Sequence, residues 1–352
     1  MDSTDELLIE RRGSAGIVRL NRPKALNSLT LPMVRIIASA LDEFAADPAI
    51  ASVIVLGEGE RGFCAGGDIR LLHRSGKEGT DEAETFWREE FLLNHAISRY
   101  LKPYVVLMDG ITMGGGVGLS AHGSHRVVTE RTRLAMPETG IGYFPDVGAT
   151  WLLPCAPGEA GTWMGLTGQT VGAADVIHAG FADHCVASSA LPALIDVIAA
   201  LPASASAADV HARIRTMAVD AGESRLAANR DVIDRAFSAD TVEEITKALA
   251  DEPGEFAAEA ASVIASRSPT SLKLALRLLR AGRKSANLAE CLNRELGACK
   301  GILYSHDFYE GVRAAVIDKD RNPKWSPASL AEVTAADIDR FFVPAQPPLF
   351  AR

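Results

Sequence analysis

The chain has 352 residues, of which 47% are hydrophobic, and a formal net charge of −9. This length allows one large domain or two smaller ones with a sizeable core. The acidic balance gives no support to a general nucleic-acid or membrane surface, and no apolar run approaches a membrane span. The N-terminal MDSTDELLIE lacks the features of a signal or transit peptide. Five scattered cysteines without a CxxC motif indicate a reducing compartment, so we expect a cytoplasmic protein.

Strands and helices alternate along the first half of the chain. Short β-branched runs predict strands, and apolar residues at helical spacing predict helices. The expected strands are 16–20, 52–56, 104–108, 126–129 and 133–135, and the expected helices are 31–44 and about 85–101. This alternation is typical of α/β layers.

The composition of the sequence changes after about Leu191, where an Ala-rich predicted helix bracketed by prolines leads into a low-complexity linker. Beyond it the pattern is almost entirely helical. Thr241 and Glu244 have capping-box spacing at one helix start. Ser268 with the following proline predicts another start, and Gly282 can close that helix. We therefore expect a core at 1–191 and a helical C-terminal region with a surface-wrapping tail at 192–352.

A glycine cluster, Met113–Gly118, follows the apolar run 104–108 and precedes small residues that can continue as a helix. Glycines let the backbone approach a ligand closely, and the first amides of a helix point outward as donors. Such donors can hold a phosphate or a developing oxyanion. Downstream, Glu138 and Asp146 are embedded in apolar and glycine residues. Donors for negative charge together with poorly solvated acids suggest an active site.

Plainer interpretations of these residues remain open. The glycines could form a dinucleotide-binding turn, but GGGVG does not give GxGxxG because Leu119 occupies the place of the third glycine. They could also serve only close packing of a helix on a strand. Glu138 and Asp146 could be a helix cap and a turn residue. Glu90 lies beside another glutamate on a predicted helix, so a solvated face is a rival to a functional role.

Three other features could indicate a binding or reactive site. His122 and His125 have H-x-x-H spacing, but no third ligand follows, so no metal site is expected. Cys64 has no histidine partner by spacing and is interpreted as a small apolar residue of its loop. A basic stripe recurs at helical spacing between 267 and 284 and can be a solvated face or can meet an anionic ligand. The stripe consists of Lys273, Arg277, Arg280 and Lys284.

Several segments resemble the crotonase (enoyl-CoA hydratase/isomerase) superfamily. They include NRPKALNSLT, GFCAGGDIR, FWREEFLLN, MDGITMGGGVGLSAHG, MPETGIGYFPDVG, SPTSLKLALRLL and HDFYEGVRAAVIDKDRNPKW. The MPET-x₄-FPDVG and HDFYEGVRA-x₃-DK segments are the most specific, and they are similar to the branch that hydrolyses 3-hydroxyisobutyryl-CoA. The resemblance implies an α/β fold, a crotonase-like spiral of repeated ββα units with an extended helical C-terminal region.

The resemblance also implies roles for individual residues. The backbone amides of Gly67 and Gly115 form the oxyanion hole for a thioester oxygen. Glu138 matches a catalytic carboxylate shared by hydratases and hydrolases, Asp146 matches the second catalytic acid of the hydrolases, and Glu90 matches an acid that contacts substrate. Hydratases usually carry a glutamate three residues after the oxyanion glycine, where this chain has glycine. That departure puts hydratase activity in doubt.

The implied activity is hydrolysis of a short β-hydroxyacyl-CoA thioester, expected to be 3-hydroxyisobutyryl-CoA in valine catabolism. Coenzyme A is then part of the substrate, and no metal or separate cofactor is expected. Coenzyme A would be bound by residues of two loops, namely Lys24, Ala25, Ala65 and Asp68. The alternatives are an enoyl-CoA hydratase or isomerase on the same fold and a non-catalytic acyl-CoA-binding protein. Relatives often trimerise, so a homo-oligomer is a further hypothesis.

Overall fold

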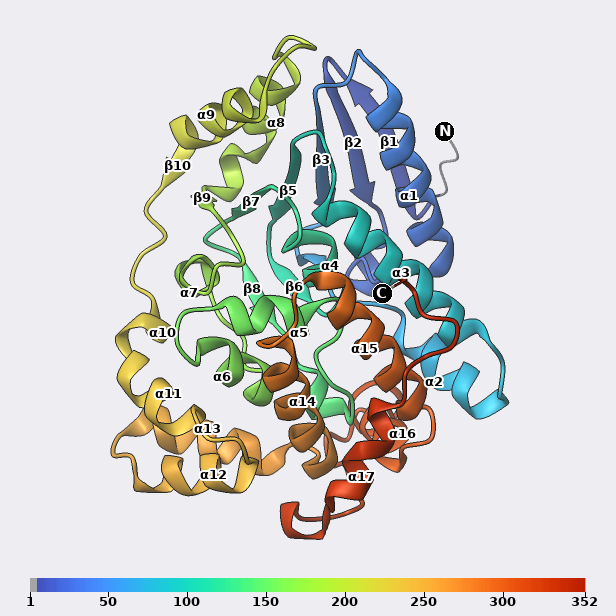
Figure 1. The fold of residues 1–352 in the computed structure, drawn as a ribbon. Coiled ribbons are helices and arrows are strands. Elements are labelled where there is room, and N and C mark those ends of the chain that lie inside the picture. The colour runs from blue at the N-terminus through green and yellow to red at the C-terminus, as the bar shows by residue number, and fades with distance from the viewer. Residues whose placement is uncertain (1–4, 352) are drawn as a thin grey trace. The chain divides into compact units, whose positions relative to one another are not determined.

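The computed structural model describes residues 5–351 (Figure 1). The chain divides into two compact units, each assembled from separate segments. The first unit contains the chain up to Gly67, Leu92–Leu134 and Val171–Ser224. The second contains Asp68–Phe91, Ala135–Thr170 and the chain from Arg225 onward. Leu191, where the composition of the sequence changes, begins helix α8 in the first unit. The division at that residue stays a prediction.

A seven-stranded sheet forms the centre of the first unit, in the order β1-β2-β3-β5-β7-β9-β10. Its strands are β1 (Leu7–Arg12), β2 (Ala15–Leu20), β3 (Ser52–Gly57), β5 (Tyr104–Met108), β7 (His125–Val128), β9 (His184–Val186) and β10 (Ala218–Val219). The five inner strands are parallel, and the two edge strands pair antiparallel with their neighbours. The predicted strands near 16, 52, 104 and 126 are confirmed, whereas β1, β9 and β10 were not predicted.

A three-stranded sheet, β4-β6-β8, repeats the order of the larger sheet. Its strands are β4 (Gly62–Cys64), β6 (Ile111–Met113) and β8 (Arg133–Ala135). The strand pairs β3–β4, β5–β6 and β7–β8 each give their first strand to the large sheet and their second strand to the small one. Each pair leads into helical segments, so the chain winds through successive ββα units. The fold is the predicted crotonase-like spiral.

Both faces of the large sheet are buried, as expected for parallel strands covered by helices. One face packs on α8 (Leu191–Ala199) and α9 (Ala207–Met217), which bury Leu194, Ile198 and Ile214 against it (Figure 1). Helix α1 (Leu31–Ala46) contacts β1 and β2. A Cβ on Gly16 would come within 2.5 Å of the Phe44 ring, so glycine makes room for this helix. The core thus fixes the strand ends from which the site loops leave.

Helices dominate the second unit, as the sequence predicts for its C-terminal part. They are α2 (Ile69–Glu78), the start of α3 (Glu82–Ser98), α5 (Ala149–Leu152), α6 (Ala160–Thr167), α10 (Arg225–Ala228), α11 (Arg230–Phe237), α12 (Val242–Asp251), α13 (Glu255–Ser266), α14 (Pro269–Gly282), α15 (Leu288–Ile302), α16 (His306–Val312) and α17 (Ala335–Asp339). The predicted caps are confirmed, because Thr241 accepts from the Glu244 amide and Ser268 from the Ser271 amide. Within residues 5–351, no helix is both long and apolar enough to span a bilayer.

Candidate active site

The two glycines predicted to supply backbone donors lie on neighbouring loops of the first unit. Gly67 follows β4, and Gly115 begins the short helix α4 (Gly115–Ser120) after β6. A Cβ on Gly66 would lie 3.6 Å from the Gly115 amide nitrogen, so the two loops are in contact. A Cβ on Gly116 would come within 2.2 Å of the Cys64 carbonyl oxygen. Only glycine allows the helix start to pack this tightly against the end of β4.

The amides of Gly67 and Gly115 have no acceptor among the backbone hydrogen bonds of residues 5–351. Later amides of α4 are engaged, since Val117 and Gly118 both donate to the Gly114 carbonyl. Free donors on two adjoining loops can bind one oxygen that carries partial negative charge. The predicted pair is therefore brought together in a form suited to an oxyanion. Gly118 itself is buried in α4.

Three of the residues predicted to bind coenzyme A also meet in the first unit. Lys24 and Ala25 form an exposed 3₁₀ turn, Pro23–Ala25, and the Ala65 amide donates to the adjacent Leu26 carbonyl over 2.9 Å. The loop of Lys24 thus lies against the loop of Gly67. Asp68 begins the second unit, where its Oδ1 caps α2 by accepting the Leu71 amide.

The three predicted acids gather in the second unit. Glu90 lies on α3, Glu138 begins the 3₁₀ turn Glu138–Ile141, and Asp146 lies in the loop before α5. Their side chains are 2%, 6% and 7% exposed, respectively. Glu90 lies on the buried stripe of α3 that also contains Phe86 and Phe91, so it is not on a solvated face. One oxygen of Glu90 and one of Glu138 are buried without a hydrogen-bond partner.

The acids are close enough for their charges to interact. Burial raises the pKa of Glu138 well above its usual value, and the charge of Asp146 raises it further. The same two causes raise the pKa of Glu90. Burial raises the pKa of Asp146 to about 7, although a hydrogen bond from Tyr143 opposes the shift. Because only Asp146 receives such a side-chain donor, we infer that it ionises before the two glutamates.

Tyr143 was missed by the sequence analysis, yet it contacts the acid directly. Its hydroxyl donates to Asp146 Oδ2 over 2.9 Å and lies 2.9 Å from the Cys299 thiol, so the thiol can donate to the same hydroxyl. The Tyr143 ring stacks on Phe144 and Trp87 at centroid distances of 4.7 and 6.2 Å. This apolar surrounding fixes the ring and keeps water from the acid.

Glu295 is a second functional candidate that sequence reasoning missed. It is fully buried on α15, and its carboxylate accepts from the backbone amides of Gly148 and Thr150. The signal for it is a charged residue on an otherwise apolar helix stripe. The stripe runs through Leu288, Cys291, Leu292, Glu295, Cys299 and Ile302. An acid at a core position is costly unless it has polar partners, and so it points to a specific task.

His122 and His125, which were predicted not to bind metal, lie in the first unit. The His125 ring is hydrogen-bonded at both nitrogens, to Ser124 and to the Ala207 carbonyl. The His211 ring lies 6.3 Å from it and 4.9 Å from the His184 ring, measured between centroids. No cluster of His, Cys, Asp or Glu suited to a metal ion occurs among residues 5–351. Cys64 is buried, and its thiol donates to Gly66 within the same loop.

The basic stripe lies along α14, where most of its charges are paired within the chain. Lys273 binds Glu243, and Arg277 binds Asp339. Arg280 bridges Glu159 and Asp240, whereas Lys284 is exposed.

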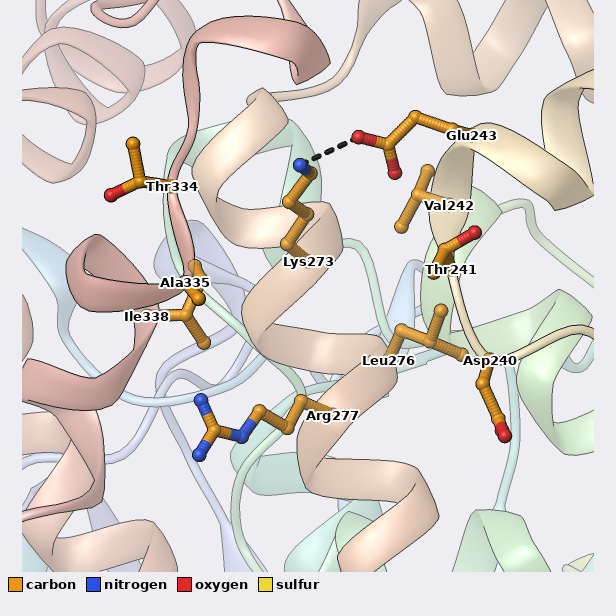
Figure 2. Close-up of a pocket in the computed structure, with 10 residues that line it drawn as sticks. All are labelled: Asp240, Thr241, Val242, Glu243, Lys273, Leu276, Arg277, Thr334, Ala335 and Ile338. Atoms are coloured by element: carbon orange, nitrogen blue, oxygen red, sulfur yellow. Dashed lines mark ion pairs between the residues drawn. The ribbon is translucent and has the colours of Figure 1, made fainter.

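Lys273 and Arg277 line a pocket of about 480 Å³ between α12, α14 and α17 (Figure 2). Asp240 and Glu243 line the same pocket, so two acids balance the two bases. None of the three buried acids borders it. These contacts favour a helix face held by ion pairs over a phosphate site.

A spiral of ββα units with adjoining glycine loops is the architecture of the crotonase class of acyl-CoA enzymes. The family model for enoyl-CoA hydratase/isomerase matches residues 15–342. The chain therefore belongs to the enoyl-CoA hydratase/isomerase family.

Curated relatives show which enzyme of this family the chain is similar to. The chain is 46% identical over 344 residues to the mitochondrial 3-hydroxyisobutyryl-CoA hydrolase of Rattus norvegicus, covering 96% of this chain and 89% of the relative. It is 45% identical over 345 residues to the Homo sapiens enzyme of the same name, covering 97% and 89%.

Two solved structures are similar over nearly their whole length. A carnitinyl-CoA dehydratase from Mycobacterium thermoresistibile has a TM-score of 0.93 and 43% identity, covering 99% of each chain. An enoyl-CoA hydratase from Rhodobacter sphaeroides 2.4.1 has a TM-score of 0.90 and 39% identity, covering 98% of this chain and all of that one. Both likenesses agree with the fold described above.

Proposed function

We propose that this protein is a thioester hydrolase that converts 3-hydroxyisobutyryl-CoA to 3-hydroxyisobutyrate and coenzyme A, as in valine catabolism. The observation that carries the site assignment is the unpartnered oxygen of buried Glu138, whose pKa is raised by burial and by the charge of Asp146. Leaving such a group without a partner costs free energy unless a substrate occupies its environment. The names of the rat and human relatives supply the substrate.

In the proposed reaction, the amides of Gly67 and Gly115 stabilise the oxyanion that forms when the thioester carbonyl is attacked. Each such donor typically lowers the barrier by about 3–4 kcal/mol. The acids share one negative charge, and Glu138 carries it in the reaction after its proton passes to Asp146. The ionised acid takes a proton from water or attacks directly, and the neutral acid can return a proton to the leaving thiolate. Asp146 and Glu90 could also bind a hydroxyl group of the substrate, because a carboxylate oxygen accepts a hydrogen bond from a hydroxyl.

Glu138 can act by two routes. It can attack the thioester carbon, which expels coenzyme A and leaves a mixed anhydride for water to hydrolyse, or it can remove a proton from attacking water. Rapid quenching followed by mass spectrometry separates them, because only the first route leaves an acyl group on the peptide that contains Glu138. An unmodified peptide throughout the first turnover would favour water activation.

The direct test is release of coenzyme A thiol from 3-hydroxyisobutyryl-CoA by the wild type and by Glu138→Gln. We expect the substitution to lower kcat at least about 100-fold, the range for loss of a general base. Glu159→Gln is the matched control, because Glu159 is also buried but pairs with Arg280 and Arg283. Equal activity of wild type and Glu138→Gln would refute the assigned role.

A hydratase or dehydratase is the second candidate, because the two solved structures described above bear those names. Gly118 opposes it, since the second glutamate expected of hydratases is missing. Hydration of crotonyl-CoA, measured beside thiol release, separates the two reactions. Hydration without thiol release would establish the second candidate. Tight acyl-CoA binding without any turnover would instead indicate a binding protein.

Three further expectations accompany this proposal. We expect no metal or redox cofactor, so thiol release should persist after dialysis against a chelator. The five free cysteines fit a reducing compartment, and we infer a cytoplasmic location. Fractionation of the native cells tests this, and recovery in mitochondria, named for the curated relatives, would contradict it. We also propose self-association, which sedimentation of the purified protein would detect.

A further inference from the structure

We propose that Glu295 is a positioning residue that holds Asp146 in its reactive place through the backbone of residues 148–150. This inference rests on the catalytic role proposed for Asp146. Glu295 comes from α15, far along the chain from the acid, and its side chain is fully buried. It does not need to touch substrate to act in this way.

The contacts of Glu295 all reach the segment that directly follows Asp146. One carboxylate oxygen accepts from the Gly148 amide over 2.7 Å. The other accepts from the Thr150 amide over 3.0 Å and from the Thr150 hydroxyl over 2.5 Å. Gly148 is the N-cap of α5 and has no side chain to bind the first-turn amides. Glu295 therefore supplies the cap that the local sequence lacks.

The held segment has a conformation that needs such support. Val147 and Gly148 are both left-handed, with φ of +53° and +81°. This backbone is unfavourable for a β-branched residue such as valine. The Ala149 amide donates back to the Asp146 carbonyl over 2.8 Å, which closes the turn. Because the turn carries Asp146, any relaxation of residues 147–150 would move the acid.

The same face of α15 also reaches the side chain of Asp146. Cys299 lies one helical turn after Glu295, and its thiol is 2.9 Å from the hydroxyl of Tyr143. That hydroxyl donates to Asp146. Helix α15 thus supports both the backbone after the acid, through Glu295, and the acid itself, through Tyr143.

A carboxyl group is well suited to this task, because its two oxygens can accept from the Gly148 amide and from both donors of Thr150. Glutamine offers one acceptor oxygen and would turn its own N–H groups toward a donor. No ion pair of the described residues includes Glu295, and burial raises its pKa to about 8 despite the hydrogen bonds that oppose the shift. An acid this costly to bury is poorly explained by packing alone.

The test compares Glu295→Gln with the wild type in thiol release and in amide hydrogen exchange. We expect kcat to fall about 10- to 100-fold, the effect of a small displacement of a reacting group. KM should stay within about twofold, because the role proposed for Glu295 involves no contact with substrate. Exchange of the Gly148 and Thr150 amides should accelerate, since these amides lose their acceptor. A folded Glu295→Gln protein with unchanged kcat and unchanged exchange would overturn the inference.

Two control variants separate this role from general destabilisation and from failure of the proposed function. Glu159→Gln removes a different buried carboxylate and should keep kcat within about twofold. An equal loss of kcat in both variants would show that Glu295 is merely structural. Asp146→Asn tests the premise, because an active Asp146→Asn enzyme refutes the catalytic role of Asp146. An inactive Asp146→Asn beside a fully active Glu295→Gln refutes the positioning role alone.

Thr150→Val is the alternative variant if Glu295→Gln does not fold. It removes only the hydroxyl donor and keeps Glu295 in place, at nearly constant side-chain volume. We expect a roughly threefold to tenfold loss of kcat with KM unchanged. Unchanged kcat and unchanged exchange of the Gly148 amide would count against the inference.

Discussion

The hydroxyl of Tyr143 donates a 2.9 Å hydrogen bond to Oδ2 of Asp146, inside a cluster where burial raises the pKa of every acid. This bond favours the ionised form of Asp146 over the neutral form. It therefore gives Asp146 an advantage over Glu138 and Glu90 in losing its proton. The order of ionisation depends on one phenolic hydroxyl.

Tyr143→Phe should shift the pH dependence of activity. Without the donor the pKa of Asp146 rises, so the acid limb of kcat/KM should move upward by about 1–2 pH units, the equivalent of a charged hydrogen bond of about 1.5–3 kcal/mol. The measurement is thiol release from about pH 5 to 9. Tyr309→Phe is the control, because the Tyr309 hydroxyl donates to the Leu303 carbonyl outside the cluster. An unshifted limb in Tyr143→Phe would contradict this reading.

Asp146→Asn should make the protein more stable at alkaline pH. An acid whose pKa is raised on folding, here from 3.8 to about 7, stabilises the folded state fully only below its unfolded pKa. That contribution is lost as the pH rises toward 7. The substitution removes the loss, so the free energy of unfolding at pH 8 should exceed that of the wild type by up to about 4 kcal/mol. Urea unfolding at pH 4.5 and pH 8 measures the difference.

The prediction is tested by comparing the stability difference between Asp146→Asn and the wild type at the two pH values. The advantage of Asp146→Asn should be small at pH 4.5 and large at pH 8. A difference that does not depend on pH would show that Asp146 keeps an ordinary pKa in the folded protein. Activity should be lost at both pH values, so the gain in stability would accompany a loss of function.

Gly116→Ala should disrupt the glycine loops. The added Cβ would meet the Cys64 carbonyl at 2.2 Å, which forces the start of α4 away from β4. We expect kcat to fall at least about tenfold, because the Gly115 amide moves with the helix. Gly172→Ala is the matched control, since nothing lies within 4 Å of its Cβ position. Wild-type thiol release by Gly116→Ala would contradict the tight packing.

Arg280→Ala should affect stability rather than substrate binding. Arg280 bonds Glu159, Asp240 and the carbonyls of Phe237 and Ala239. Its removal leaves Glu159 with one of its two cationic partners, and we expect a loss of about 2–4 kcal/mol in the free energy of unfolding. KM for the acyl-CoA should stay unchanged. A large rise in KM without loss of stability would instead place the α14 stripe at the phosphates of coenzyme A.

Much of this architecture could be predicted because its signals are local. The run at 104–108 coincides with β5, and Thr241 and Ser268 cap the helices whose starts they predicted. The glycines near Met113 revealed a close backbone approach through their lack of side chains. Strand β1 was not predicted, because only Leu7 among its residues is buried and this edge strand therefore has little apolar signal.

The supports of the acid cluster could not be predicted in the same way. Tyr143 lies in a motif that was recognised, but its bond to Asp146 depends on the turn at Val147, whose left-handed backbone is unusual for valine. Glu295 and Cys299 approach the cluster through folding of the last third of the chain. Sequence spacing carries no information about such a contact, although an acid on an apolar stripe is a usable signal.

Glu295 also has a consequence for how the protein is made. It lies 147 residues after Gly148, so a ribosome adding about 5–20 residues per second synthesises it roughly 7–30 seconds later. During that interval, the nascent segment that carries Glu138 and Asp146 lacks its cap. We expect its acids to be solvated during that interval, with pKa values near the usual ones. The raised pKa values of this cluster are therefore acquired only near the end of synthesis. A chain truncated before Glu295 would lack them.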